Sequence, residues 1–473
     1  MKTLFELKRE LPSEYISPCD VAATALPAGF KSVPPALPEL SEVTVERHYS
    51  RLARASFGVD DGAYLLGSCT MKYNPKLNEA VAALKGFTDI HPLAPEEDAA
   101  GAMELMFNLE AALNEITGMD AMTFQPAAGA HGEYTGLKII DAYHKSRGEK
   151  RTKVLVPDSA HGTNPASAAM CGFEVVNISS AGHEVDLDAL RAAVGEDTAA
   201  LMLTNPTTLG LFERNIEQIR DIVHEAGGLL YYDGANLNAI MGVVRPGDMG
   251  FDVVHLNLHK TFSTPHGGGG PGAGPVGVKA FLKEFLPSPV VVSTGDGYAF
   301  AEPARTIGKV NAFYGNFSVL VKAYAYILSL GKEGIPASAK RAVLNANYLK
   351  KSLEPEYPAE GDGYCMHEFV VGAENLKKER GVTASDLAKG LIDAGIHPPT
   401  VYFPLTVHEA MMFEPTETEN KDSLDRVAFV MKELYRRAER EPECFKEFPL
   451  TTPISRPDEL KAAKELKLTA DMS

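Results

Sequence analysis

The chain has 473 residues, of which 45% are hydrophobic and 23% are charged. That balance is typical of a globular protein, and the length by itself suggests about three domains of roughly 150 residues. Acidic side chains outnumber basic ones by 63 to 46, and the net charge of −17 argues against nucleic acid and anionic membranes as partners, because like charges repel.

The cysteines and the N-terminal residues indicate the cellular compartment. The five cysteines are odd in number, widely spaced and without a C-x-x-C pair, which favours a reducing compartment over a disulfide framework. Residues 1–11 are charged and lack the apolar core of a secretion signal. No apolar run approaches the ~18 residues that a membrane span needs. We therefore expect a soluble, cytoplasmic protein.

Residues 1–60 are expected to form an N-terminal arm. Prolines interrupt it repeatedly, and each favours extended or turn structure over packed helices, because the ring restricts the backbone and removes a hydrogen-bond donor. These residues are Pro12, Pro18, Pro27, Pro34, Pro35 and Pro38. Such an arm either wraps a neighbouring subunit or covers the body of its own chain, and the sequence does not separate these two possibilities.

Residues 61–330 show the alternation of helices and strands that is typical of a large α/β domain. A helix is expected over 95–117, because apolar residues recur at helical spacing, acidic residues open it and Gly118 follows it. Strands buried on both faces and separated by helices form a mostly parallel sheet with helices on each side. Buried strands are predicted at 152–157, 173–179, 200–204, 228–233 and 252–258, with helices at 131–147, 187–194 and 213–226 between them.

A smaller α+β domain is expected at the C-terminus, over residues 331–473. A long apolar helix at about 315–333 leads into it. The pattern that follows predicts strands near 368–371 and 401–405, helices near 383–394 and 421–440, and a polar tail.

A lysine stands where the last strand of the large domain ends. Lys260 follows the strand expected at 252–258. Ligands of α/β proteins bind at the carboxyl ends of parallel strands, and a partly desolvated lysine can act there as an amine nucleophile, because burial disfavours its charged form. A lysine at a strand end also commonly extends its charge into water, so Lys260 alone does not establish a site.

A carboxylate ends the preceding strand. Asp233 lies 27 positions before Lys260, which leaves room for one crossover and one strand, so both side chains are expected at the same edge of the sheet. A pyridoxal phosphate (PLP) ring needs this pair, because the carboxylate keeps the pyridine nitrogen protonated and the amine holds the aldehyde carbon. An aspartate after a strand is also a common helix N-cap.

Two further segments supply groups of the kind that this cofactor requires. The segment QPAAGAHGE at 125–133 opens an expected helix, and Ala128, Gly129 and Ala130 leave its backbone N–H groups accessible to a phosphate. His161 follows an expected strand, where its imidazole either stacks on a cofactor ring or caps the next helix.

Other motifs are weaker evidence for a binding site. Thr207 follows another expected strand, so it either lines the same site or belongs to a plain turn. Residues 267–272 formally fit G-x-G-x-x-G, but a dinucleotide fingerprint joins a first strand to its helix, whereas this run follows Lys260 and contains Pro271. A mobile or closely approaching loop is expected there instead. Metal-ligand spacing and G-x-S-x-G are absent from the sequence, so neither metal nor serine chemistry is expected.

Together these segments resemble the glycine decarboxylase P-proteins of the glycine cleavage system. The resemblance is strongest in LNLHKTFSTPHGGGGPG at 256–272 and extends to LGSCTMK at 66–72. It continues through 125–136, 161–166 and 231–239, so it covers nearly the whole chain. Some members are a single chain about twice this long, and others are split into two subunits. By its length and its lysine motif, this chain is similar to the second subunit of the split type.

The resemblance implies a fold-type I architecture in which Lys260 holds PLP covalently as a Schiff base. At the matched positions Asp233 is expected to pair with the pyridine nitrogen and His161 to stack on the ring. The backbone amides expected to hold the phosphate are those of Ala128, Gly129 and Ala130. Further residues expected at the site are His259, in a catalytic role, and Ala235, Thr207 and Thr70.

The family also implies a reaction and partners. Glycine loses its carboxylate as CO2, and the remaining aminomethyl group passes to the lipoyl arm of an H-protein, which places the enzyme among the oxidoreductases. The expected partners are that lipoylated H-protein and a subunit 1, with two copies of each subunit in a heterotetramer. Ser263 and Ile90 depart from the family's pattern, and no role is assigned to them.

Two alternatives remain open at this point. Another fold-type I PLP enzyme, such as an amino acid decarboxylase or a cysteine desulfurase-like lyase, shares a lysine and an aspartate of this kind but needs no lipoyl protein. A catalytically idle partner subunit is the second alternative. The presence of both Lys260 and Asp233 argues against it, because an idle subunit has no use for the pair.

Overall fold

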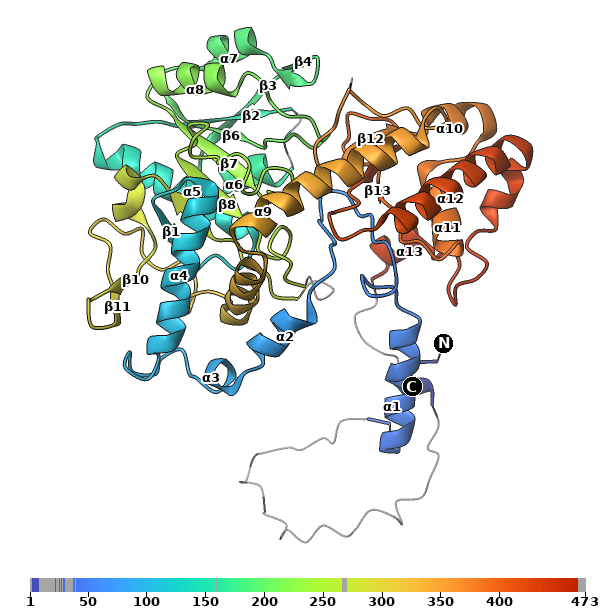
Figure 1. The fold of residues 1–473 in the computed structure, drawn as a ribbon, viewed down its shortest axis with the longest axis horizontal. Coiled ribbons are helices and arrows are strands. Elements are labelled where there is room, and N and C mark those ends of the chain that lie inside the picture. Colours follow the sequence, from blue (N-terminus) through green and yellow to red (C-terminus); the bar gives the residue numbers. More distant parts are fainter. Residues whose placement is uncertain are drawn as a thin grey trace. The chain divides into compact units, whose positions relative to one another are not determined.

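The computed structural model describes residues 2–7, 22, 25, 27, 29, 37–38, 40–158, 160, 162–265, 270–361 and 363–466. The chain forms two compact units, of which one comprises Val59–Phe445 and the other combines Met1–Gly58 with Lys446–Ser473 (Figure 1). The fold and the site described below belong to the first unit. None of the helices in the described part of the chain is long and apolar enough to span a membrane.

The centre of Val59–Phe445 is a seven-stranded sheet in the order β1-β9-β8-β7-β6-β2-β3. Strands β8, β7, β6, β2 and β3 are mutually parallel, and β9 and β1 add an antiparallel edge. The strands are β1 (Ala121–Thr123), β2 (Lys153–Pro157), β3 (Glu174–Ile178), β6 (Thr198–Leu203), β7 (Leu229–Gly234), β8 (Val253–Leu256) and β9 (Val276–Val278). The predicted mostly parallel sheet is confirmed, and each predicted strand lies within two residues of an observed one.

Both faces of the sheet are buried, because alternate residues of each strand enter two different cores. Tyr231 and Val253 pack in one core against Leu137 of helix α5 (Gly129–Ser146). Tyr232 and Val254, their neighbours in sequence, pack in the other core. The second core includes residues of α8 (Ile216–Glu225) and of the long helix α9 (Phe317–Leu353). Burial on both faces explains why these strands read as continuous apolar runs.

Helix α5 approaches the sheet closely through its glycines. A Cβ atom at Gly136 would come within 2.4 Å of the Tyr231 ring, and one at Gly132 within 3.0 Å of the His255 Cβ. Any larger side chain at these positions would push the helix away from β7 and β8. Helices α6 (Thr163–Met170) and α7 (Leu187–Ala193) complete the alternation of strands and helices.

Helix α4 spans Ala100–Thr117 and ends at Gly118, which adopts the left-handed conformation with φ 72°. That end was predicted correctly. The predicted start at residue 95 is wrong, because residues 95–99 form a turn in which the Ala99 N–H bonds the Pro95 carbonyl at 3.2 Å. The acidic residues 96–98 therefore precede the helix instead of occupying its first turn. Helices α2 (Lys76–Ala82) and α3 (Lys85–Thr88) lie just before it in the chain.

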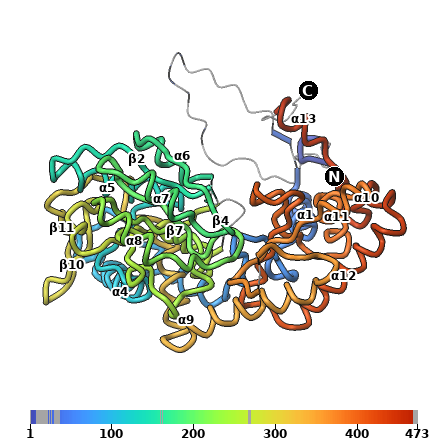
Figure 2. The backbone as a smooth tube through the Cα atoms, turned by 90° about the horizontal axis from the view of Figure 1, so that it is seen from above, coloured from blue at the N-terminus to red at the C-terminus, as the bar shows by residue number. Residues whose placement is uncertain are grey.

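Helix α9 (Phe317–Leu353) leads from the sheet to the C-terminal part of this unit, as Figures 1 and 2 show. It contains a break at Gly331, where φ is 62° and ψ is −175°. The helix predicted at 315–333 therefore corresponds to the part before the break. Pro336 lies in the first turns after it, where a proline is tolerated.

The C-terminal part contains the antiparallel sheet β12-β14-β13, with helices α10, α11 and α12. The strand predicted at 401–405 is only two residues long, and β14 was missed because AMMF is as typical of a helix as of a strand. The elements are β12 (Phe369–Gly372), α10 (Glu374–Arg380), α11 (Ala384–Asp393), β13 (Thr400–Val401), β14 (Ala410–Phe413) and α12 (Lys421–Arg440). The domain boundary expected at 331 stays a prediction.

The N-terminal residues do not remain extended as far as residue 60. Helix α1 (Glu42–Arg54) begins after Ser41, whose side chain accepts a hydrogen bond from the Thr44 N–H at 3.2 Å. The expectation of extended or turn structure is wrong for this stretch, because all the interrupting prolines precede the cap. Most of the proline-rich segment lies outside the described residues.

Candidate active site

A cavity of roughly 270 Å³ opens where β6, β7 and β8 end. Segments far apart in the sequence meet in its walls: the start of α5, the loops after three parallel strands, and a stretch just before β12. The lining residues are Ser68, Gly129, Ala130, Glu133, Thr163, Thr204, Pro206, Thr208, Asp233, Ala235, Asn236, His255, Asn257, His259, Lys260, His367 and Glu368. Asp233 and Lys260 therefore share one cavity, as the strand order predicts.

Asp233 is a buried carboxylate at the end of β7. Its Oδ2 accepts hydrogen bonds from the Asn164 side-chain amide at 3.0 Å and the Thr204 hydroxyl at 3.4 Å, and its Oδ1 accepts one from the Ala235 N–H at 3.1 Å. Burial acts to raise the pKa of Asp233, but nearby His255, these donors and Lys260 together lower it below its usual value. The group is therefore an anion in the wall of the cavity.

A histidine and a tyrosine stand behind this carboxylate. His255 Nε2 lies 3.3 Å from Asp233 Oδ1, and its Nδ1 lies 2.8 Å from the Tyr231 hydroxyl. His255 is fully buried. If the Tyr231 hydroxyl donates to Nδ1, the imidazole carries its proton on Nε2, facing the carboxylate. Sequence reasoning missed His255, although a histidine in an otherwise apolar core strand was a usable signal.

Lys260 follows β8 in a turn whose backbone N–H bonds the Asn257 carbonyl at 3.0 Å. It is half-buried, and its charge contributes to lowering the pKa of Asp233. Next to it, Thr261 accepts a hydrogen bond from the Leu237 N–H at 2.8 Å, which ties this turn to the loop after β7. The amine and the carboxylate thus face one cavity from adjacent parallel strands.

The start of α5 forms another wall. Ala128, the residue before the helix, provides no side-chain cap, so the first backbone N–H groups of the helix are not taken by a capping oxygen. A Cβ atom at Gly129 would come within 2.6 Å of Asn257 Oδ1, so a larger residue there would displace the Asn257 side chain. That Asn257 oxygen is buried and has no hydrogen-bond partner within the protein. These features suit a small anion that also offers a donor.

The other predicted site residues are placed as follows. Ala235 and His259 line the cavity, and His259 Nδ1 accepts a hydrogen bond from the Ala273 N–H at 3.3 Å. Thr207 does not line it, since its hydroxyl accepts from the Leu209 and Leu211 N–H groups. Its neighbours Pro206 and Thr208 line the cavity instead.

The remaining predicted residues are His161, the glycine-rich run and Thr70. His161 and residues 266–269 of the glycine-rich run lie outside the described part of the chain. Thr70 does not line the cavity; its backbone N–H and hydroxyl donate to the buried carboxylate of Glu414 at 3.0 and 2.7 Å.

Sequence reasoning also missed the acidic and imidazole groups of the cavity. Glu133 accepts hydrogen bonds from the Thr163 and Ser167 hydroxyls at 2.8 and 2.7 Å. His367 and Glu368 reach the cavity from the residues before β12. Glu133 lies in the motif that opens α5 and could have been noticed there. Nothing in the local sequence indicates that His367 and Glu368 come close to Lys260.

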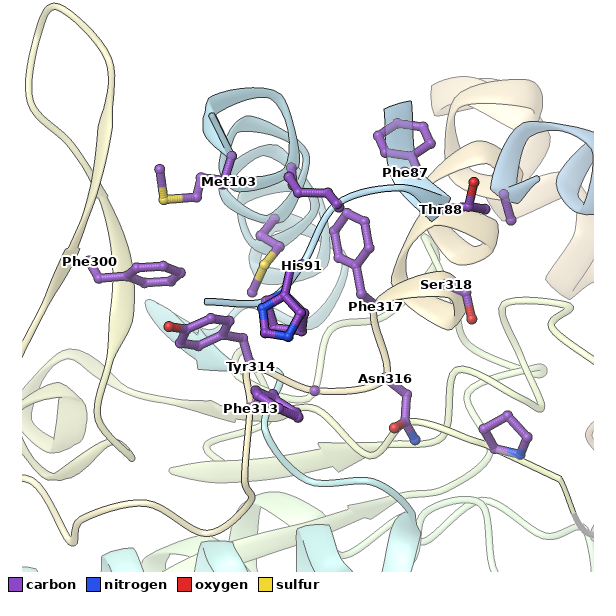
Figure 3. A pocket seen from close by; sticks show the side chains of 18 residues that line it. Phe87, Thr88, His91, Met103, Phe300, Phe313, Tyr314, Asn316, Phe317 and Ser318 are labelled. Atoms are coloured by element: carbon purple, nitrogen blue, oxygen red, sulfur yellow. The ribbon is translucent and has the colours of Figure 1, made fainter. Parts of the chain in front are cut away.

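A second cavity, of about 480 Å³, lies near the start of α9 and shares no lining residue with the first. Figure 3 shows the rings of Phe300, Tyr314 and Phe317 around His91. The Phe300 and Tyr314 rings are stacked, with centroids 4.2 Å apart. Its walls are mainly apolar and contain no paired amine and carboxylate among the described residues. We therefore assign the chemistry to the smaller cavity.

Comparison with solved structures identifies the fold. A glycine decarboxylase (P-protein) of the glycine cleavage system matches 90% of this chain and 93% of its own, with a TM-score of 0.70 and 21% identity. The cysteine desulfurase of Thermococcus onnurineus matches 80% of this chain and 95% of its own, with a TM-score of 0.62 and 14% identity. The fold is that of the fold-type I PLP-dependent enzymes.

Sequence comparison narrows the class to a family. A family model described as "Glycine dehydrogenase, C-terminal domain" matches residues 338–444. A probable glycine dehydrogenase (decarboxylating) subunit 2 of Treponema denticola is 63% identical over 433 residues, 91% of this chain and 90% of that protein. Its counterpart in Thermotoga petrophila is 57% identical over 466 residues, 98% of both chains. The chain belongs to the family of decarboxylating glycine dehydrogenase subunit 2, which confirms the predicted family.

Proposed function

We propose that this chain holds PLP covalently at Lys260 and decarboxylates glycine, and that the remaining aminomethyl group passes to the lipoyl arm of an H-protein. The observation that carries the proposal is the meeting of Lys260 and the ionised Asp233 in one cavity at the carboxyl edge of a fold-type I sheet. Membership of the family supports the choice of substrate, because the relatives are named for glycine decarboxylation.

The residues of the cavity fit this cofactor. Asp233 is a buried anion suited to a protonated ring nitrogen, and Lys260 offers an amine. The start of α5, where Gly129 lies against the Asn257 side chain, offers backbone N–H groups to a phosphate. The buried Asn257 oxygen without a partner offers a further polar contact. When bound, PLP supplies an electron sink for the bond that breaks at the substrate α-carbon.

The chain's own residues would then act as follows. The Asp233 carboxylate would hold a proton at the ring nitrogen, and His255 would keep that carboxylate ionised and oriented. Lys260 would hold the cofactor through its amine and, with substrate bound, would serve as a proton-transfer group in the cavity.

Partners follow from the same family. The relatives are named as a second subunit, and this supports a subunit 1 as partner. We propose two copies of each subunit in a heterotetramer. The lipoyl-bearing H-protein is the proposed acceptor of the aminomethyl group.

The first experiment tests the cofactor and its attachment. The purified chain with subunit 1 is mixed with PLP, its visible spectrum is recorded before and after borohydride, and the labelled peptide is mapped. A reducible band and a pyridoxyl adduct on Lys260 are expected. Lys260→Ala should show neither, whereas Lys145→Ala, at a lysine whose side chain is 71% exposed, should behave like the parent. An adduct on another lysine would contradict the assignment.

The second experiment tests the reaction. Exchange of labelled CO2 into the glycine carboxyl group is measured with and without lipoylated H-protein. Exchange that depends strongly on H-protein is expected. Decarboxylation at full rate without it would indicate another fold-type I amino acid decarboxylase or lyase, and failure of the assembled protein to bind PLP would indicate a non-catalytic subunit.

A further inference from the structure

The active-site cavity contains no arginine among its described lining residues. Arginine is the side chain best shaped to bind a carboxylate, through two parallel hydrogen bonds. The cationic side chain among the lining residues is Lys260, which the proposed function assigns to the cofactor. A substrate amino acid that enters this cavity therefore needs another group to hold its carboxylate.

His367 is a buried imidazole in the same wall with both ring nitrogens unpartnered. It is 2% exposed, and neither Nδ1 nor Nε2 has a hydrogen-bond partner within the protein. Its closest acidic neighbour, Glu368 Oε1, lies 3.8 Å from Nε2, beyond hydrogen-bonding distance. Burial lowers the pKa of His367, so the ring is neutral and carries one N–H donor and one acceptor. A buried N–H donor without an acceptor destabilises the folded protein unless a ligand accepts its hydrogen bond.

Glu368, beside it, retains a proton. Its Oε2 accepts a hydrogen bond from the Ser68 N–H at 2.8 Å. Burial, and then the nearby Glu414, raise the pKa of Glu368 well above its usual range. Glu414 receives more donors, from the Thr70 N–H, the Thr70 hydroxyl and the Asn236 amide, at 3.0, 2.7 and 2.8 Å. Glu368, with fewer donors and a raised pKa, is therefore the member of the pair that holds a proton and offers an O–H donor.

We propose that His367 and Glu368 bind the carboxylate of the substrate amino acid, through the imidazole N–H and the carboxylic acid O–H. The inference deepens the proposed function and rests on it. Both residues line the cavity that contains Lys260, and the charge of Lys260 acts on both of them. The two donors thus face the space in which the α-carbon of a substrate would lie.

Neutral donors suit a reaction in which the carboxylate leaves. An arginine would stabilise the full charge of the bound carboxylate, and that stabilisation would be lost as neutral CO2 forms. Two uncharged donors can orient the group while stabilising its charge less. The nearby Glu414, which raises the pKa of Glu368, further disfavours retention of a negative charge on the substrate.

His367 and Glu368, together with Glu414, are also residue types that can bind a metal ion. Their ligand atoms lie within 4.8 Å of one another. Two observations favour the anion. Lys260 contributes a positive charge to the same cavity and would repel a cation. The Glu414 oxygens are already occupied by three donors, whereas the two nitrogens of His367 are not.

The test compares glycine with methylamine, which is glycine without its carboxylate. Each is titrated into the PLP-loaded complex with subunit 1, and the dissociation constant is taken from the change in the visible spectrum. His367→Ala should weaken glycine by about 10- to 100-fold, the loss typical of a hydrogen bond to a charged group, and leave methylamine within about twofold. His367→Asn, which keeps an N–H donor, should recover part of the loss.

Glu368 supplies the second arm. Glu368→Gln keeps a donor at the same position and should change glycine binding by less than about threefold, whereas Glu368→Leu should weaken it by about tenfold or more. Methylamine again serves as the reference within each variant, so a general distortion of the site would affect both ligands. Thermal melting of each variant shows whether it is folded.

Three results would overturn the inference. Equal weakening of glycine and methylamine in His367→Ala would give the residue a merely structural role. Dissociation constants for glycine and methylamine that both stay at the parent's values would remove it from the site. Metal analysis of the dialysed complex that finds one equivalent of a divalent ion, lost in His367→Ala, would make the cluster a cation site. Absence of the visible band from the unsubstituted complex would instead overturn the proposed function itself.

Discussion

The Nε2 atom of His255 lies 3.3 Å from Asp233 Oδ1, and the two side chains belong to neighbouring parallel strands that pair residue 233 with residue 255. The imidazole is fully buried, so its contribution to the carboxylate is not screened by water. The Tyr231 hydroxyl lies 2.8 Å from the other ring nitrogen, Nδ1, and when it donates there the imidazole carries its proton on Nε2, facing Asp233. The charge of Asp233 therefore depends on a chain of three buried side chains.

His255→Phe tests this chain. Loss of His255 raises the pKa of Asp233, so more of the Asp233 carboxylate is protonated at low pH. We expect the affinity for PLP to fall by about tenfold, and to fall further at pH 6 than at pH 8. Absorbance titration of the cofactor-free complex across this range measures it. Tyr231→Phe, which keeps the imidazole, should show a smaller effect. Parent-like binding by His255→Phe at every pH would contradict this account.

The close approach of α5 to the sheet predicts a cost for any larger residue at Gly136. A Cβ atom there would lie 2.4 Å from the Tyr231 ring and 3.1 Å from Val253, both of which are buried. Gly136→Ala should therefore lower the free energy of unfolding by about 1–3 kcal/mol, as measured by urea denaturation. Gly101→Ala is the matched control, since a Cβ atom there meets nothing within 4 Å and alanine favours the helix. Equal effects of the two substitutions would refute the packing argument.

Lys72 is predicted to stabilise the fold through a buried ion pair. Its Nζ lies 2.6 Å from Glu417, and it also donates to Asn238 and to the Thr261 carbonyl, at 2.8 and 2.7 Å. Burial acts to lower the pKa of Lys72, but Glu417 outweighs it and the pKa is raised. Lys72→Met should cost about 3–5 kcal/mol, because Glu417 is left buried without its partner.

A second substitution, at Glu417, distinguishes loss of the ion pair from loss of packing at Lys72. Lys72→Met combined with Glu417→Gln should recover much of the stability lost by Lys72→Met alone. Lys76→Met is the control, because that lysine pairs with Asp60 at 64% exposure, and its denaturation midpoint should not move. A double variant as unstable as the sum of the single ones would show that the charges do not interact.

Glu110 is predicted to make stability depend on pH. Burial raises the pKa of Glu110 from 4.5 to about 7, against the opposing hydrogen bond from the Met122 N–H at 2.9 Å. Because the folded state binds this proton more tightly than the unfolded state, its contribution is present below pH 4.5 and is lost as pH rises to about 7. Glu110→Gln should therefore gain stability relative to the parent between pH 5 and pH 7.5.

Chemical denaturation at several pH values in that range measures the difference between Glu110→Gln and the parent. Glu104→Gln, at an exposed position of the same helix, should follow the parent at every pH. A constant difference between Glu110→Gln and the parent over this range would exclude the carboxyl group as its source.

The fold was largely accessible from sequence because its signals are local. Each parallel strand is buried on both faces, so each appears in the sequence as an apolar run. Gly118 ends α4 because glycine readily adopts the left-handed backbone conformation found there. The same locality placed Asp233 and Lys260 at the ends of adjacent strands. The errors fell where local signals were ambiguous, as at the short strand β13 and at the start of α4.

The rest of the site depended on tertiary structure. Glu368 and Ser68 are 300 residues apart and joined by one hydrogen bond of 2.8 Å, and Thr70 meets Glu414 across 344 residues. Whether a histidine next to an apolar strand is an ordinary core residue or an unsatisfied donor depends on what surrounds it, and His367 is surrounded by residues from distant parts of the chain. The sequence by itself determined the parallel sheet and the lysine–aspartate pair, because periodicity and strand ends are local properties. Only the tertiary structure decided which buried polar groups complete the cavity, because hydrogen-bond satisfaction and pKa depend on neighbours in space.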